Sequence, residues 1–154
     1  MDAVEFERRL RALAVREGLT FASFVTLHAA DRAVLQTTLV QRFDPQASYR
    51  ERDVNEILKG WLDSVGVMVE TDHVHLRRWL VDTNVLMRKD DCSEYRIHPQ
   101  LELRPDLVRD AAVAQRDAAA IVAEARRTAQ DRRAARRAEW MKRSGAEGAG
   151  SPAR

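Results

Sequence analysis

The stretch from Asp72 to His98 constrains the fold of this chain more than any other. Its first part carries Leu76 and Leu80 four residues apart with Trp79 beside them, so one side of the segment is apolar. Apolar residues at this spacing share one face of a helix. We therefore predict an amphipathic helix over residues 72–82.

Two short runs of alternating apolar and polar residues follow this helix. They cover residues 85–88 and 95–97, and the polar residues 89–93 separate them. Alternation with a period of two, interrupted by turn residues, predicts a β-hairpin. A helix that leads directly into a hairpin is typical of the second half of a winged helix.

The preceding segment predicts two more helices. One starts near Asp31 and stops before Pro45, because proline cannot continue a helix. The other starts at a capping box formed by Ser48 and Glu51, in which each side chain satisfies an orphan amide of the first turn. Its apolar residues at i, i+3, i+4, i+7, i+8 and i+11 are Val54, Ile57, Leu58, Trp61, Leu62 and Val65.

The order from residue 31 to residue 98 is thus helix, helix, helix and hairpin, with either a strand or a linker at residues 67–69. This is the order of a winged helix, a variant of the helix-turn-helix. The first thirty residues predict a helical extension: one helix over residues 2–16 that ends at Gly18, and a short helix capped by Thr20.

Four short motifs in this region carry a resemblance to a known family. They are Val-Asn-Glu-Ile-Leu at 54–58, Leu-Arg-Arg-Trp-Leu-Val-Asp at 76–82, Leu-Met-Arg at 86–88 and Tyr-Arg at 95–96. Together they resemble the bacterial domain of unknown function 2087 family over residues 31–98. The resemblance implies a small winged-helix-like domain that often stands beside transcription-regulator modules, and it implies no catalytic residue and no cofactor.

After residue 104 the composition changes to alanine, arginine, glutamine and glutamate. No glycine or proline occurs from Asp106 to Met141, which predicts one long helix. A seam of small residues repeats at alternating steps of four and three and allows close approach of another helix. The seam suits both a homodimer and packing onto the body of the same chain, and its residues are Leu107, Ala111, Ala114, Ala118, Ile121 and Ala125.

Charge divides the chain in two. Residues 1–103 carry 14 Lys and Arg against 17 Asp and Glu, whereas residues 104–154 carry 12 against 7. The expected parts are therefore an extension (1–30), a winged-helix-like domain (31–103), a long basic helix (104–143) and a disordered tail (144–154). The basic helix has three arginine pairs: Arg126 and Arg127, Arg132 and Arg133, Arg136 and Arg137.

Two functions remain open. In the first, the chain regulates transcription by binding double-stranded DNA: His75, Arg77 and Arg78 approach the groove, while Arg88, Lys89 and Arg96 of the wing contact phosphate. Against this, residues 31–103 carry 10 basic and 13 acidic groups, which leaves the basic helix as the stronger phosphate ligand. In the second, the chain is an adaptor: the winged helix binds a protein partner and the basic helix mediates assembly.

Other classes of function find little support. The sequence lacks a phosphate-binding glycine loop, a nucleophile elbow, a His-Glu-x-x-His motif and paired cysteines, so we expect no enzyme and no cofactor. His73 and His75 would point to different faces of a helix, which argues against a metal site. The acidic start, the single Cys92 and the lack of a long apolar run predict a cytoplasmic protein that does not contact a membrane.

Overall fold

A computed structural model describes residues 1–148, without the side chains of Glu102 and Glu147. The helices are α1 (Ala3–Ala14), α2 (Phe21–Val25), α3 (Ala29–Val40), α4 (Glu51–Leu62), α5 (His73–Asp82), the 3₁₀ turn η1 (Leu101–Leu103), α6 (Ala111–Ala114) and α7 (Ala118–Gly148); the strands are β1 (Leu19–Thr20), β2 (Val69–Glu70), β3 (Leu86–Arg88) and β4 (Tyr95–Ile97).

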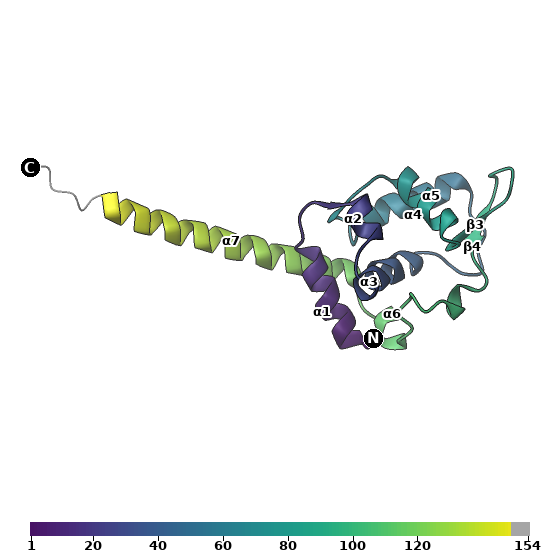
Figure 1. Ribbon diagram of the computed structural model, residues 1–154, viewed down its shortest axis with the longest axis horizontal. Coiled ribbons are helices and arrows are strands. Elements are labelled where there is room, and N and C mark those ends of the chain that lie inside the picture. The colour runs from purple at the N-terminus through teal and green to yellow at the C-terminus, as the bar shows by residue number, and fades with distance from the viewer. Residues whose placement is uncertain (149–154) are drawn as a thin grey trace, which may run out of the picture.

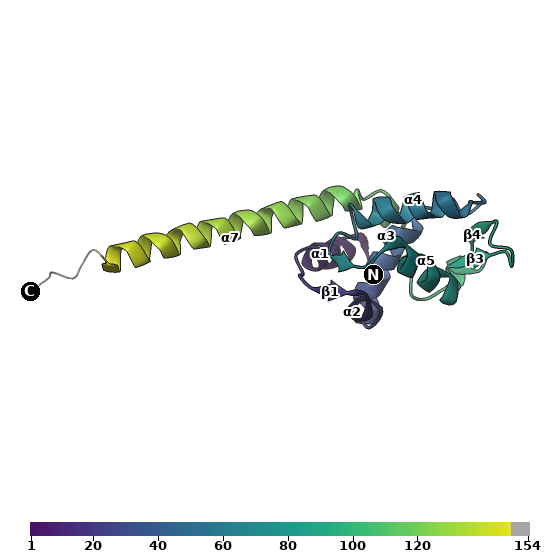
Figure 2. The same cartoon turned by 90° about the horizontal axis from the view of Figure 1, so that it is seen from above.

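The predicted class, mainly α with a small hairpin and a long C-terminal helix, is confirmed. Figures 1 and 2 show the shorter elements gathered into one body, from which most of α7 projects as a rod. One apolar core runs through the body, from Phe6 of α1 to Ala125 of α7. The N-terminal helices and the start of α7 therefore share a core with the segment 31–98.

The N-terminal helices form where the sequence predicts them. The Asp2 carboxylate accepts a hydrogen bond of 2.8 Å from the Glu5 amide and caps α1. Beyond α1, Gly18 has a φ of +68°, a left-handed conformation that glycine adopts without strain. The Thr20 side chain caps α2, as predicted.

A parallel pairing joins this extension to the segment before α5. Leu19 of β1 lies opposite Val69 of β2, and Thr20 lies opposite Glu70. Of residues 67–69, where a strand and a linker were both left open, only Val69 lies in a strand, and residues 67 and 68 form a turn. The strand β1 was not predicted. The pairing holds the N-terminal extension against the rest of the body.

α3, α4 and α5 supply much of the core. α3 begins at Ala29, two residues earlier than expected, and the apolar stripe of α4 is confirmed with Val54, Leu58 and Trp61 fully buried. The Trp61 indole nitrogen donates a hydrogen bond of 3.0 Å to the Thr38 hydroxyl of α3. This bond satisfies a polar group that burial would otherwise leave without a partner.

The predicted capping box at the start of α4 is wrong. Arg50 occupies the N-cap position and makes no side-chain cap. The Ser48 hydroxyl instead hydrogen bonds to Glu94, which follows the hairpin turn, and Glu51 forms an ion pair with Arg77 of α5. Long-range partners therefore take both side chains that the local motif would have used.

The predicted hairpin is confirmed. Leu86 of β3 lies opposite Ile97 of β4, and Arg88 lies opposite Tyr95. Tyr49, in the connection between α3 and α4, forms a further antiparallel bridge with Tyr95 through two backbone hydrogen bonds of 2.8 Å. The connection between α3 and α4 thus adds one strand-like residue beside the hairpin.

A continuous helix from Asp106 to Met141 was predicted, and this is wrong. The carboxylate of Asp110 caps the short helix α6, and that of Asp117 accepts from the Ala120 amide at 2.9 Å in the first turn of α7. Helix formation thus restarts twice, each time after an aspartate. α7 then extends to Gly148, beyond the predicted end at residue 143, and residues 149–154 of the predicted tail lie outside the described part.

The predicted seam is consequently divided. Leu107 precedes α6, and Ala111 and Ala114 lie exposed on α6. Ile121 and Ala125, on α7, are buried in the core beside α1. The part of the seam that lies on α7 therefore packs against the body of its own chain.

Candidate nucleic-acid interface

The two neighbouring arginines of α5 have different environments: Arg77 contacts α4, and Arg78 lies on the surface. Only 14% of the Arg77 side chain is exposed; its guanidinium pairs with Glu51 at 3.1 Å and hydrogen bonds to Asn55, both on α4. Arg78 is exposed and forms no ion pair within residues 1–148. Of the two predicted groove-reading arginines, only Arg78 is thus oriented away from the body.

His75 is also exposed, but two neighbours engage it. Its Nδ1 lies 3.0 Å from Oδ2 of Asp72, and its ring centroid lies 6.4 Å from that of Phe21. Hydrogen bonds from the backbone and the ring of His75 lower the pKa of the Asp72 carboxyl. Since α2 also packs on Trp79 through Phe21 and Phe24, the N-terminal extension covers one flank of α5.

Two of the predicted wing residues pair with Glu94, a carboxylate of the hairpin itself. Glu94 pairs with Lys89 and, at 2.9 Å, with Arg96, and it also accepts from the Ser48 hydroxyl. These donors, Lys89 first, lower the pKa of Glu94 from 4.5 to about 2. Of the three wing cations, only Arg88 has no carboxylate partner within residues 1–148.

A polar contact that the sequence did not predict lies beneath the hairpin. The Tyr95 hydroxyl donates to Glu51 at 3.2 Å, and Glu51 is the carboxylate that holds Arg77. Burial, followed by the charge of Glu51, raises the pKa of Tyr95. Glu51 therefore links α4, α5 and β4; its position in the first turn of α4 led to its assignment to a capping box.

Some arginines of α7 contact the body, and others form no ion pair in the described chain. The Arg126 guanidinium donates a hydrogen bond of 2.9 Å to the Ala14 carbonyl, and Arg133 forms an ion pair of 2.5 Å with Glu17. Arg132, Arg136 and Arg137 are exposed and form no ion pair within the described chain. At 100° per residue, Arg132, Arg133, Arg136 and Arg137 fall on one side of α7; we call these four residues the arginine stripe.

The arginine stripe continues the side of α7 that packs on α1. A shallow hollow of about 490 Å³ lies where the two helices diverge, and its lining includes Arg11 together with three residues of the stripe. No acidic side chain is among its described lining residues. The hollow is therefore lined by cationic side chains, of which Arg11 and Arg133 pair with carboxylates outside it and Arg132 and Arg136 do not.

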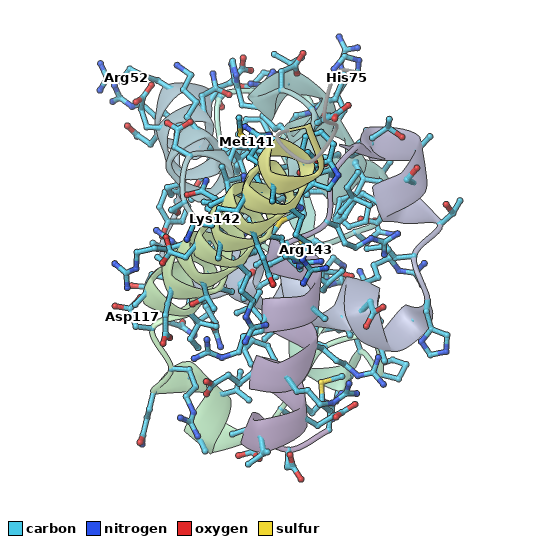
Figure 3. All side chains as sticks on the ribbon, turned by 90° about the vertical axis from the view of Figure 1, so that its left-hand side faces the viewer. Arg52, His75, Asp117, Met141, Lys142 and Arg143 are labelled. Carbon is cyan, nitrogen blue, oxygen red and sulfur yellow. The ribbon has the colours of Figure 1, made fainter. Side chains whose placement is uncertain are left out.

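The far part of α7 stands clear of the body. Residues 130–148 span about 28 Å at 1.5 Å per residue, and they carry six Lys and Arg against three Asp and Glu. Figure 3 views the molecule from this end, with Met141, Lys142 and Arg143 on the helix in front of the body. Trp140 and Met141 are 67% and 62% exposed.

The hairpin and the free end of α7 lie at opposite ends of the molecule. Both Figure 1 and Figure 2 show β3 and β4 on one side of the body and α7 leaving from the other. The two predicted DNA-contacting surfaces therefore do not form one continuous face.

Two other kinds of site find no counterpart in the described structure. Within residues 1–148, His, Cys, Asp and Glu side chains form no group of three or more that could hold a metal ion. None of the described helices has both the length and the apolar character needed to cross a membrane.

Comparison with known proteins identifies part of the chain. Neither a curated protein nor a solved structure matches it. Residues 26–97, from the end of α2 to the end of β4, match the model of a family described as an uncharacterized protein conserved in bacteria (DUF2087). The resemblance found in the sequence motifs is thereby confirmed for this segment, which we call the DUF2087 domain because it matches that family model.

Proposed function

We propose that this chain is a non-enzymatic, cytoplasmic regulatory protein that binds double-stranded DNA, and that the arginine stripe of α7 makes most of the phosphate contacts. The observation that carries the proposal is the stripe itself: four arginines within two turns of a projecting helix, three of them without an ion pair in the described chain. Neutralisation of phosphates by such cations supplies most non-specific affinity for DNA. Basic helices that lie in the major groove are an established mode of DNA binding.

The DUF2087 domain has a smaller part in this proposal. Its order of helix, bridge, helix, helix and hairpin supports the winged-helix interpretation, in which α5 would be the helix that enters the groove. Among the predicted groove and wing cations of this domain, Arg78 and Arg88 form no ion pair in the described chain, so we assign them to secondary contacts. Because the hairpin and the free end of α7 lie at opposite ends of the molecule, these contacts would reach a different stretch of DNA.

A second candidate function is that of an adaptor whose α7 binds an acidic protein. The exposure of Trp140 and Met141 favours it, since large apolar side chains surrounded by charge are common anchors in protein interfaces. Trp140 falls on the same side of α7 as the arginine stripe, by the helical period. One partner could therefore contact both.

Anisotropy of a labelled random duplex of about 20 base pairs, two helical turns, tests the first function. The full chain should bind, with log K falling against log salt at a slope of roughly −3.6 for four phosphate contacts. A variant carrying Arg132→Gln, Arg133→Gln, Arg136→Gln and Arg137→Gln should bind at least about tenfold more weakly, a loss of 1.4 kcal/mol, with a smaller slope. Truncation at Leu103 is less suitable, because it would also remove the core residues Val113, Ile121 and Val122.

A matched control makes the same change of charge on the body. Arg8, Arg42, Arg50 and Arg52 are all exposed, and their joint replacement by glutamine should leave binding nearly unchanged. Equal losses in both variants would mean that net charge alone is sensed, which contradicts a role for the stripe. No binding by the full chain would leave the adaptor as the better account.

A further inference from the structure

A pocket of about 780 Å³ lies in the DUF2087 domain and the segment that follows it, and neither α5 nor the arginine stripe is among its described lining residues. It forms where the segment after β4 returns across the C-terminal end of α3. Apolar side chains from four parts of the chain line it, among them Val40, Phe43, Ile97, Leu101 and Leu107. Its volume lies in the range of small-molecule sites, and its lining combines these apolar side chains with polar ones.

The polar side chains of this pocket are cationic or neutral. Arg96, His98 and Arg109 line it together with Gln41 and Gln46, and no Asp or Glu is among its described lining residues. This is unusual for its surroundings, because residues 1–103 carry an excess of acidic groups. The pocket therefore favours an anion over a cation.

Each of the cationic residues retains donors. Arg109 donates one Nη2 hydrogen to the Arg104 carbonyl at 2.9 Å, and Arg96 donates from Nη2 to Glu94 at the same distance. A guanidinium has five N–H donors, so both side chains keep others for a ligand. The His98 Nδ1 accepts from the Gln100 amide at 3.1 Å, which leaves the proton of the neutral ring on Nε2.

We propose that this pocket binds an organic carboxylate with an apolar alkyl or aryl body. The carboxylate lies between Arg96 and Arg109, because a guanidinium matches its planar pair of oxygens. The apolar body packs against Val40, Phe43 and Leu101. A neutral lipid would leave the remaining N–H donors of both guanidiniums without an acceptor, and a simple phosphate would leave the apolar surface uncovered, so neither fits the whole lining.

Calorimetric titration of the full chain tests the proposal with two carboxylates, decanoate and 2-naphthoate. Their neutral counterparts, decan-1-ol and naphthalene-2-methanol, serve as ligand controls. At least one carboxylate should bind with 1:1 stoichiometry and at least about tenfold more tightly than its alcohol, as expected where charged hydrogen bonds are made. Failure of both carboxylates to saturate at millimolar concentration, or equal binding of acid and alcohol, would overturn the proposal.

Two variants locate the site. Arg96→Gln with Arg109→Gln should reduce carboxylate affinity at least about tenfold, whereas Arg16→Gln with Arg52→Gln makes the same change of charge elsewhere and should not. All four arginines are exposed, so the fold should survive both double changes. In ¹H–¹⁵N spectra the ligand should shift the amides of Ile97, Leu107 and Val108; saturable binding without these shifts would place the ligand elsewhere and count against the pocket.

Discussion

Arg126 of α7 donates a hydrogen bond of 2.9 Å from Nη1 to the carbonyl oxygen of Ala14, the last residue of α1. Carbonyl groups in the last turn of a helix lack intrahelical donors and carry partial negative charge. The bond forms next to the buried residues Ile121 and Ala125, just before α7 leaves the body. The attachment of the projecting helix is thus both apolar and electrostatic.

Replacing Ile121 with aspartate should detach α7 from α1. Ile121 is buried, and an unpaired charge in its place should lower the free energy of unfolding by about 3 kcal/mol. Arg126→Gln should cost less, about 1 kcal/mol for one hydrogen bond. Urea unfolding monitored by circular dichroism measures both, and Ala135→Asp on the exposed part of α7 is the control. Equal effects of Ile121→Asp and Ala135→Asp would contradict the observed packing.

Light scattering should find a monomer of 17.6 kDa at moderate salt. The seam residues that could have joined two chains, Ile121 and Ala125, are buried against α1. A dimer would have to use residues 130–148, where like-charged arginine stripes would face each other. A dimer that dissociates on Trp140→Ser would show that the free end of α7 associates despite this repulsion.

The two neighbouring arginines of α5 should respond differently to substitution. Arg77→Ala removes the contacts with Glu51 and Asn55 and should lower the free energy of unfolding by about 1–2 kcal/mol. Arg78→Ala touches no such contact and should change it by less than about 0.5 kcal/mol. Thermal unfolding of both variants checks this. Equal Tm values would mean that the contacts of Arg77 with Glu51 and Asn55 do not stabilise the fold. Replacing Arg77 and Arg78 together would therefore change stability and DNA binding at once. The pair Arg78→Gln with Arg88→Gln tests DNA binding without removing the Arg77 contacts.

The hairpin should weaken in acid. Because the pKa of Glu94 falls from 4.5 to about 2 on folding, its contribution to stability is complete above pH 4.5 and is lost as the pH drops toward 2. Glu94→Gln removes the charge at all pH values. The difference in Tm between the two proteins should therefore be largest near neutral pH and vanish near pH 2. A difference that stays constant across this range would show that Lys89 and Arg96 do not stabilise the ionised form.

Helical periodicity was sufficient to predict much of the fold. The stripe from Val54 to Val65 and the pair Leu76 and Leu80 point to the core as expected, because their spacing leaves only one buried face. Alternation was likewise sufficient for the hairpin, whose register pairs Leu86 with Ile97. The spacing that predicts each of these elements is contained within a few neighbouring residues.

The errors arose where a distant residue or a competing cap decided the structure. Ser48 has the sequence context of a cap, yet Glu94, 46 residues away, takes its hydroxyl. Residues 106–117 have high helix propensity, but Asp110 and Asp117 accept from amides two or three residues ahead and start new helices. The same limit applies to the candidate interface: spacing placed Arg77 beside Arg78, but only the fold shows that Glu51 holds one of them.

Gly66 should resist substitution although it lies outside every helix and strand. It is buried, and a Cβ atom there would come within 2.1 Å of Cζ3 of the Trp61 ring, so the indole would have to move away from its hydrogen bond with Thr38. Gly66→Ala should therefore lower the free energy of unfolding by about 1–3 kcal/mol. Gly60→Ala is the matched control: it lies in α4 with open space around it and should raise stability by up to about 1 kcal/mol. Chemical unfolding of both variants compares them, and a neutral Gly66→Ala would mean that the Trp61 ring can shift at no cost.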